Sequence, residues 1–152
     1  MMPLSFKTAM STDLEKLISI RIGAMRESLE NVGRFDPERA RERFANKFTA
    51  DKTTLVLQGD EIIGFYVLLA RENYLWLDHL YIDPATQGVG VGSSVMNKII
   101  KISRSKKLPL KLCALKESKA NSFYIKHGFV LTHSEEWDNF YTRPYLQEIS
   151  PA

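Results

Sequence analysis

Three glycines at alternate positions, Gly88, Gly90 and Gly92, lie in the segment 83–94 between a predicted strand and a predicted helix. Glycine allows a backbone to approach a ligand closely, and it leaves amide N–H groups free to point in one direction. The helix that follows adds the positive end of its macrodipole. The segment is therefore suited to hold a pyrophosphate group. The alternative is a glycine-rich turn that binds nothing.

Two widespread phosphate-binding motifs do not fit this segment. A Walker loop requires a lysine before its serine or threonine, but Ser93 directly follows Gly92. A dinucleotide fingerprint requires a G-x-G-x-x-G spacing and an acidic residue about 20 positions later. Here the third glycine comes one position early, and the stretch 105–108 contains no acid. The pattern that remains is Q-x-x-G-x-G, formed by Gln87, Gly90 and Gly92.

This pattern and a second one resemble the motifs of a known family. With the stretch 80–84 before it, the glycine segment resembles the acetyl-CoA-binding motif of the GCN5-related N-acetyltransferase (GNAT) superfamily. Downstream, the stretch 120–129 is similar to the family's A-x-x-F-Y-x-x-x-G-F helix. One difference is Glu117, which stands where relatives usually carry an asparagine; Asn121 is close by but out of register.

The resemblance implies acetyl-CoA as cofactor and assigns its contacts. Backbone groups of the strand that ends at Ile82 would bond the pantetheine arm, and amides of the glycine segment would bond the pyrophosphate. A free N–H near Leu80 could also point at the thioester oxygen. The cofactor-binding residues so implied are Leu80, Tyr81, Ile82, Gln87, Gly88, Val89, Gly90, Val91, Gly92, Ser93, Asn121 and Tyr124.

The resemblance also implies direct transfer of the acetyl group to an amine of a small molecule or protein. Tyr124 is the candidate general acid. A phenol with a reference pKa of about 10 can protonate a thiolate whose thiol has a pKa of about 8.5. The alternative is a core role, since Tyr124 shares a stripe at helical spacing with Ala120 and His127. A non-catalytic module of the same fold, binding acyl-CoA or a metabolite, is the second candidate function.

Asp78 is the candidate general base or site for a cationic substrate. Side chains alternate along a strand, so Asp78 shares a face with Trp76 and Leu80. A carboxylate among such apolar neighbours is unusual and points to a functional role. A solvated or hydrogen-bonded carboxylate without a role is the alternative. His79 points to the opposite face, which favours a packed histidine over a base.

In the family fold the acceptor amine binds beside the first helix, the loop after it and the closing hairpin. Arg21 and Arg26 could meet a substrate carboxylate, although exposed helix arginines are usually only solvated. The candidate substrate-binding residues are Met25, Arg26, Leu29, Arg34, Phe35 and Asp78.

Covalent, disulfide and metal chemistry receive no support from the sequence. Cys113 is the only cysteine and lies within a predicted strand, so we expect a buried structural thiol. It cannot form an internal disulfide, which favours a reducing cytoplasmic location. There is no G-x-S-x-G nucleophile motif, and the three histidines show no metal-ligand spacing.

Composition and charge limit the partners. The 152 residues are 44% hydrophobic and 26% charged, which is typical of a globular chain, and no apolar run suits a membrane span. A basic cluster could attract nucleic acid, but cations also suit a helix C-terminus, and we therefore expect neither nucleic acid nor membrane as partner. Dimers are common among relatives, which makes a homodimer one option. The basic cluster comprises Lys98, Lys101, Arg104, Lys106 and Lys107.

The predicted elements follow the order β-α-α-β-β-β-α-β-α-β-β, which also matches the family fold. This order predicts one α/β domain over 1–152, with a mixed, mostly antiparallel sheet flanked by helices. The expected strands are 5–10, 53–58, 62–70, 74–82, 110–114, 129–137 and 140–146. The expected helices are 12–29, 37–48, 90–105 and 119–127.

Turn and capping signals mark several boundaries. Thr12 with Glu15 predicts a capping box at the first helix, and Asp36 before Pro37 predicts the start of the second. The pair Asp138-Asn139 predicts the turn of the closing hairpin.

Overall fold

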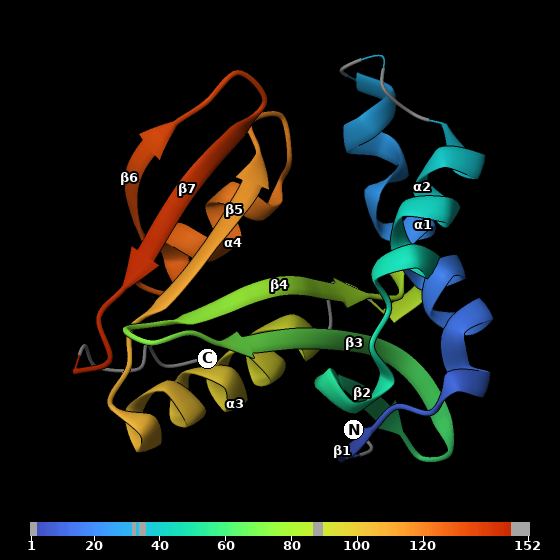
Figure 1. Cartoon of the computed structure of the whole chain (residues 1–152), viewed down its shortest axis with the longest axis horizontal. Coiled ribbons are helices and arrows are strands. Elements are labelled where there is room, and N and C mark those ends of the chain that lie inside the picture. Colours follow the sequence, from blue (N-terminus) through green and yellow to red (C-terminus); the bar gives the residue numbers. More distant parts are fainter. Residues whose placement is uncertain (1–2, 32, 34–35, 87–89, 147–152) are drawn as a thin grey trace. The chain divides into compact units, whose positions relative to one another are not determined.

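A computed structural model of the chain describes residues 3–31, 33, 36–86 and 90–146 (Figure 1). The strands are β1 (Leu4–Thr8), β2 (Thr53–Gln58), β3 (Glu61–Ala70), β4 (Leu75–Ile82), β5 (Leu110–Leu115), β6 (Val130–Ser134) and β7 (Asp138–Arg143). The helices are α1 (Leu14–Asn31), α2 (Pro37–Lys47), α3 (Val91–Lys106) and α4 (Ala120–Lys126). Short 3-10 helices lie at η1 (Ser11–Asp13), η2 (Ala50–Lys52) and η3 (Pro84–Thr86).

The strands form one seven-stranded sheet in the order β1-β2-β3-β4-β5-β7-β6. β1 pairs antiparallel with β2, β2 with β3, β5 with β7, and β7 with β6. β4 and β5 run parallel, with Leu75 opposite Leu110 and Trp76 opposite Lys111. A parallel pair needs a long crossover, and α3 supplies it. The expected α/β fold with a mixed, mostly antiparallel sheet and flanking helices is confirmed.

One compact unit comprises Met1–Val67 and His79–Val89. Its core is apolar: Leu55 of β2, Phe65 of β3 and Leu17 of α1 are fully buried. Helices α1 and α2 lie side by side (Figure 1), and Arg41 Nη1 of α2 donates a hydrogen bond to Glu15 Oε2 of α1 at 2.6 Å. This unit therefore carries the first two helices on the β1–β3 part of the sheet and the end of β4.

A second compact unit comprises Leu68–Asp78 and Gly90–Ala152. The buried face of α3 presents Val95, Met96 and Ile99, and β5 contributes the fully buried Leu110 and Leu112. β5, β7 and β6 pair in sequence beside α4 (Figure 1). The glycine segment from Gly90 on and the whole of α4 belong to this unit.

The predicted helix starts had different outcomes. Asp36 caps α2 as expected, since its Oδ1 accepts a hydrogen bond from the Arg39 amide at 3.2 Å. The expected capping box of Thr12 is wrong, because Thr12 lies inside η1. There Asp13 reaches back instead, and its carboxylate accepts from the Met10 amide at 2.8 Å. A tight 3-10 turn before a helix moves the capping role to other residues.

The predicted turn of the closing hairpin is also wrong. Asp138 and Asn139 lie in β7, opposite Leu115 and Ala114 of β5, and the chain turns over 135–137. Asn139 belongs to the strand because its side chain bonds there: its Oδ1 accepts from Ser134 Oγ at 2.7 Å. Tertiary hydrogen bonding thus outweighs the local turn preference of Asn and Asp.

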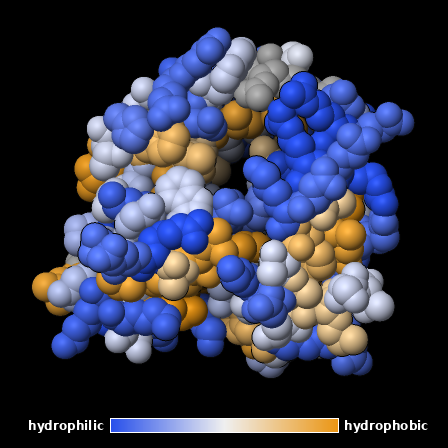
Figure 2. Space-filling view, viewed as in Figure 1, coloured by the Kyte–Doolittle hydropathy of each residue, from blue (hydrophilic) through white to orange (hydrophobic). Residues whose placement is uncertain are grey.

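Among the described residues, no helix is both long enough and apolar enough to cross a membrane. Polar and charged side chains cover much of the face seen in Figure 2, with apolar atoms between them. Large apolar side chains exposed to solvent include Met10, Ile125, Val130 and Leu131. Scattered exposure of this kind is ordinary for a protein surface.

Candidate active site

The described part of the glycine segment begins at Gly90, the N-cap of α3. Gly90 has φ +82°, a left-handed conformation that favours glycine, and no side chain caps the helix there. The first helical bond runs from the Ser94 amide to the Gly90 carbonyl at 3.1 Å. The amides of the first turn therefore have no partner within the helix and are suited to an anion. Gln87, Gly88 and Val89 lie outside the described residues.

The two motif segments touch each other. A Cβ atom added to Gly92 of α3 would lie 3.3 Å from Cε1 of Phe123 in α4. Such a contact is tighter than most real Cβ contacts, so the ring of Phe123 packs directly on the glycine. The small size of Gly92 thus leaves room for the ring, which would have to shift by a few tenths of an ångström to admit a Cβ atom. The structure brings the start of α3 and the middle of α4 together.

The end of β4 is held by close approach to β3. A Cβ atom at Gly64 would lie 2.6 Å from the Tyr81 carbonyl oxygen and 2.8 Å from Ile82 Cδ1. Just after the strand, the Asp83 amide donates to the Ile63 carbonyl at 2.7 Å. The backbone at Tyr81 and Ile82 is therefore fixed by its neighbour. Sequence reasoning missed Gly64, because a glycine in a strand carries no side-chain signal beyond its small size.

Tyr124 lies in a ring of aromatic side chains and is only 8% exposed. Its ring centroid is 5.6 Å from Phe123, 5.7 Å from Phe129 and 6.2 Å from Tyr141. His127 is buried as well, and its Nδ1 lies 3.0 Å from the Phe123 carbonyl oxygen. The helical stripe is thus packed, and packing alone does not separate a core tyrosine from a general acid.

Asn121 is a junction between α4, β5 and β7. Its Nδ2 donates to the carbonyls of Leu115 and Ser118, each at 2.8 Å. Its Oδ1 accepts from Tyr141 Oη at 2.7 Å and from Asn139 Nδ2 at 3.1 Å. The whole amide is therefore engaged in holding the start of α4 against the sheet. Glu117, in contrast, is exposed in the turn before α4.

Asp78 is exposed on β4 and accepts a hydrogen bond from Trp76 Nε1 at 3.1 Å. The bond confirms that these two side chains share one face of the strand. Asp78 also acts electrostatically on Cys113 of β5.

Cys113 is exposed, so the expectation of a buried cysteine is wrong. Partial burial of the thiol still removes some of its hydration. Partial burial, followed by the charges of Asp138, Asp78 and Glu135, raises the pKa of Cys113 to about 11. The thiol is therefore neutral near pH 7, which disfavours it as a nucleophile.

His79 packs among aromatic rings. Its ring centroid lies 5.4 Å from Phe44 of α2, 6.4 Å from Phe65 of β3 and 5.6 Å from Tyr81. The guanidinium of Arg21 lies over two of these rings, with Cζ 5.9 Å from the Phe44 centroid and 5.8 Å from the Tyr81 centroid. The expectation of a packed histidine is confirmed. We call the rings of Phe44, Phe65, His79 and Tyr81 the β4 aromatic cluster.

The candidate acceptor residues are only partly described. Met25 and Leu29 are partly buried on α1. Arg26 is exposed, and its Nε pairs with Glu30 Oε1 at 2.7 Å one helical turn away. Arg34 and Phe35 lie outside the described residues. The structure thus leaves Arg26 already paired with a carboxylate of its own helix.

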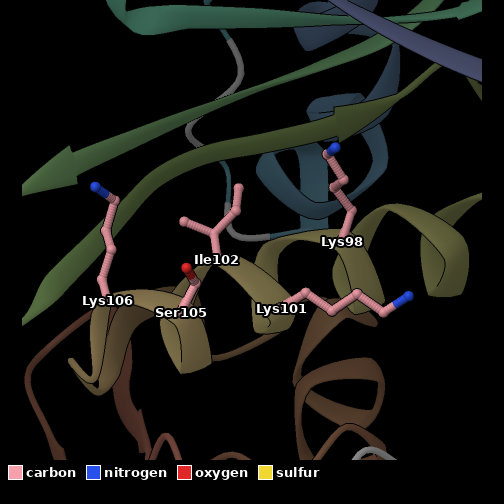
Figure 3. Close-up of a pocket in the computed structure, with 5 residues that line it drawn as sticks. All are labelled: Lys98, Lys101, Ile102, Ser105 and Lys106. Atoms are coloured by element: carbon pink, nitrogen blue, oxygen red, sulfur yellow. The ribbon is translucent and has the colours of Figure 1, made fainter.

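The basic cluster lies along the exposed side of α3. Lys98, Lys101, Ile102, Ser105 and Lys106 line a shallow depression of about 380 Å³. Lys98, Ile102 and Lys106 project from the same side of the helix, whereas Lys101 points along another (Figure 3). Charges spread along a solvated helix are the ordinary result of amphipathic patterning. In the part of the chain that the structure describes, no group of three metal-binding side chains exists.

Comparison with known proteins identifies the family of this chain. The sequence profile of the acetyltransferase (GNAT) domain matches residues 50–131, more than half of the 152-residue chain. This range contains the glycine segment, α3, β5 and α4. A comparison with proteins of curated function finds no match.

Many solved structures share the fold. The PaiA N-acetyltransferase of Thermoplasma acidophilum, solved with coenzyme A, is 20% identical with a TM-score of 0.80; the match covers 95% of this chain and 100% of that chain. A GCN5-related N-acetyltransferase of Rhodopseudomonas palustris is 19% identical, with a TM-score of 0.76 and coverage of 95% and 98%. The ribosomal-protein-S18-alanine N-acetyltransferase of Escherichia coli is 14% identical, with a TM-score of 0.72 and coverage of 96% for both chains.

Proposed function

Because this chain belongs to the GNAT acetyltransferase family, we propose that it transfers an acetyl group from acetyl-CoA directly to an amine, acting as one catalytic domain. The observation that carries the proposal is the contact between Gly92 and the ring of Phe123. It joins the uncapped start of α3 to the helix that bears Tyr124. The start of α3 and the candidate acid are therefore parts of one packed unit.

The cofactor would be held mainly by backbone groups. Amides in the first turn of α3, at Val91, Gly92 and Ser93, have no partner within the helix and fit the charge of a pyrophosphate. Gln87, Gly88, Val89 and Gly90 complete the proposed corner, and backbone groups at Leu80, Tyr81 and Ile82 are assigned to the pantetheine arm. Asn121 fits less simply, because its amide is fully engaged. A direct contact with the arm would require it to give up one of these bonds.

Tyr124 is the proposed general acid. When the amine attacks the thioester carbon, the carbon–sulfur bond breaks and the sulfur leaves as a thiolate. The phenol of Tyr124 donates its proton to that sulfur, because a thiolate is stabilised by a neutral donor. The exposed Asp78 carboxylate would accept the proton of the amine through water, or bind a cationic acceptor. Cys113 takes no part, since its thiol is neutral at working pH.

The acceptor is an amine of a small molecule or of a protein. Met25, Leu29, Arg26, Arg34 and Phe35 are the proposed contacts. Of the similar structures, the Escherichia coli enzyme is named for an alanine of ribosomal protein S18. We propose a cytoplasmic enzyme, with a homodimer as one option and with no role for nucleic acid or membrane.

Calorimetry tests the cofactor site. Coenzyme A and acetyl-CoA should each release or absorb heat on binding the folded chain, and Gly90→Asp should abolish this heat by placing a carboxylate beside the pyrophosphate. Gly59→Asp is the matched control, because Gly59 also has a positive φ, +63°, but lies in the β2–β3 turn. Absence of binding by the native chain would refute the proposal.

A panel of amines with acetyl-CoA, followed by release of free thiol, tests the reaction. Thiol release with at least one amine is expected. Binding of acetyl-CoA without release for any amine would favour the non-catalytic binding module instead.

A further inference from the structure

Arg21 of α1 is a cation held by aromatic rings. Its Cζ atom lies 5.9 Å from the ring centroid of Phe44 and 5.8 Å from that of Tyr81. Both rings belong to the β4 aromatic cluster. Attraction between a guanidinium and a ring face fixes the position of the cation, but it does not use the N–H groups at the guanidinium edge as hydrogen-bond donors.

The hydrogen bonding of Arg21 is incomplete. Its Nε is buried and has no hydrogen-bond partner among the described residues. The other two arginines discussed in α1 and α2 differ, since Arg26 pairs with Glu30 and Arg41 with Glu15. A buried donor without a partner is rare and costly, and it calls for an acceptor that the described residues do not supply.

The residue as a whole is partly exposed although its Nε is not, so an acceptor that bonds Nε must enter beside the rings from the exposed part of the residue. An arginine fork suits one class of acceptor above others. Its Nε–H and one Nη–H point in parallel and match the two oxygens of a carboxylate or phosphate. Charge-assisted bonds of this kind are about twice as strong as neutral ones.

Arg21 also lies beside the strand that the proposed function uses. Its neighbouring ring belongs to Tyr81, whose backbone is assigned to the cofactor arm. Two residues further along α1, Gly23 packs on η3: a Cβ atom there would lie 3.5 Å from Pro84 Cγ. Helix α1 is therefore seated against the end of β4, and its position fixes Arg21 there.

We propose that Arg21 binds an oxyanion, a carboxylate or phosphate, carried by the acceptor, so that the substrate is an anionic amine. This inference rests on the proposed function for the identity of the ligand as acceptor. It does not involve Arg26, which already has a carboxylate partner.

The Nε–Hε signal of Arg21 in a nitrogen-correlated NMR spectrum reports on the site directly. The signal is assigned by its loss in Arg21→Lys, with Arg43→Lys, an exposed arginine of α2, as the matched control. The intact protein, saturated with coenzyme A, is titrated with the common amino acids and with phosphoethanolamine. The same titration is then made with cadaverine and ethanolamine, which are amines without an oxyanion.

We expect the Arg21 signal to shift with at least one anionic amine and to stay in place with cadaverine and ethanolamine. A shift with an amino acid would assign a carboxylate, and one with phosphoethanolamine a phosphate. Thiol release should agree: Arg21→Gln should raise the KM of that anionic amine about tenfold or more. The KM of its uncharged counterpart should stay unchanged, and Arg21→Lys should restore only part of the loss.

Two results would overturn the proposal. In the first, calorimetry shows that coenzyme A binds, but neither an amino acid nor phosphoethanolamine shifts the Arg21 signal. In the second, coenzyme A shifts the Arg21 signal and no anionic amine shifts it further. Arg21 would then bind the cofactor and not the acceptor. Failure of the proposed function is distinct, because the chain would then bind no coenzyme A at all.

Discussion

Two aromatic clusters in this molecule have similar composition and opposite hydrogen bonding. The β4 aromatic cluster surrounds Arg21, whose buried Nε has no partner among the described residues. The α4 aromatic cluster, formed by Phe123, Tyr124, His127, Phe129 and Tyr141, is bordered by polar groups with partners. There Tyr141 Oη donates to Asn121, and Arg143 Nε donates to the His127 carbonyl at 2.7 Å.

This difference in hydrogen bonding separates a cluster that holds the structure in place from one that is suited to bind a ligand. A fully bonded polar network fixes one conformation, and the α4 aromatic cluster is suited to hold Tyr124 still. An unpartnered buried donor costs stability, and the oxyanion proposed above would give the Nε of Arg21 its acceptor. Composition alone does not distinguish the clusters, since each combines aromatic rings, a histidine and an arginine. The clusters are distinguished by whether each polar atom has a hydrogen-bond acceptor.

The largest expected effect comes from filling the gap between β3 and the end of β4, next to the β4 aromatic cluster. Gly64→Ala places a methyl group 2.6 Å from the Tyr81 carbonyl oxygen, a backbone atom that cannot move away by itself. We expect a loss of about 3 kcal/mol or more in the free energy of unfolding, measured with urea. Gly92→Ala is the control, because its neighbour is a side-chain ring and its change should be far smaller. Equal losses would mean that β3 and β4 adjust easily.

Breaking the saturated network should have the next largest effect. Asn121→Ala leaves the hydroxyl of the buried Tyr141 without its acceptor and frees two carbonyls. We expect about 2 kcal/mol of destabilisation by urea unfolding. Tyr141→Phe and the double variant complete a cycle, and the two changes should be clearly non-additive. Additive losses would contradict a shared network.

A variant of Tyr124 tests whether the α4 aromatic cluster only holds this side chain in place or also presents a reactive phenol. Tyr124→Phe keeps the packed ring and removes the phenol, so turnover should fall at least about tenfold, equivalent to about 1.4 kcal/mol. Coenzyme A affinity by calorimetry should change little. Tyr141→Phe changes a second tyrosine of the same cluster, and its turnover should stay near normal. Unchanged turnover in Tyr124→Phe would remove the proposed acid.

The smallest effect concerns Cys113. Its pKa of about 11 leaves about 100-fold less thiolate at pH 7 than the ordinary value of 9.0 would, and the greater nucleophilicity of a basic thiolate offsets part of this. Alkylation by iodoacetamide should therefore be about tenfold slower than for an ordinary thiol. The rate should keep rising with pH until about 11. Asp138→Asn should speed the reaction at pH 7; a plateau near pH 9 would show an ordinary thiol.

The sequence predicted much of this molecule where local signals are strong. The β2 range 53–58 and the Asp36 cap agree with the structure. Predictions failed where distant atoms decide. Asn139 enters β7 because Ser134 and Asn121 bond it, and Asp13 replaces Thr12 because a 3-10 turn intervenes. Gly64 and Arg21 were missed or underused for the same reason, since close approach and absent acceptors appear only in three dimensions.

The contact of Gly92 with the Phe123 ring has an evolutionary consequence. A larger residue at the first position would collide with the ring unless the second became smaller, so the two positions should mutate as a pair. Aligned homologues ought to show this covariation even though the residues are separated by the whole of β5 in the chain. An engineer who alters the start of α3 to accept a different acyl carrier would therefore need to redesign α4 in the same step.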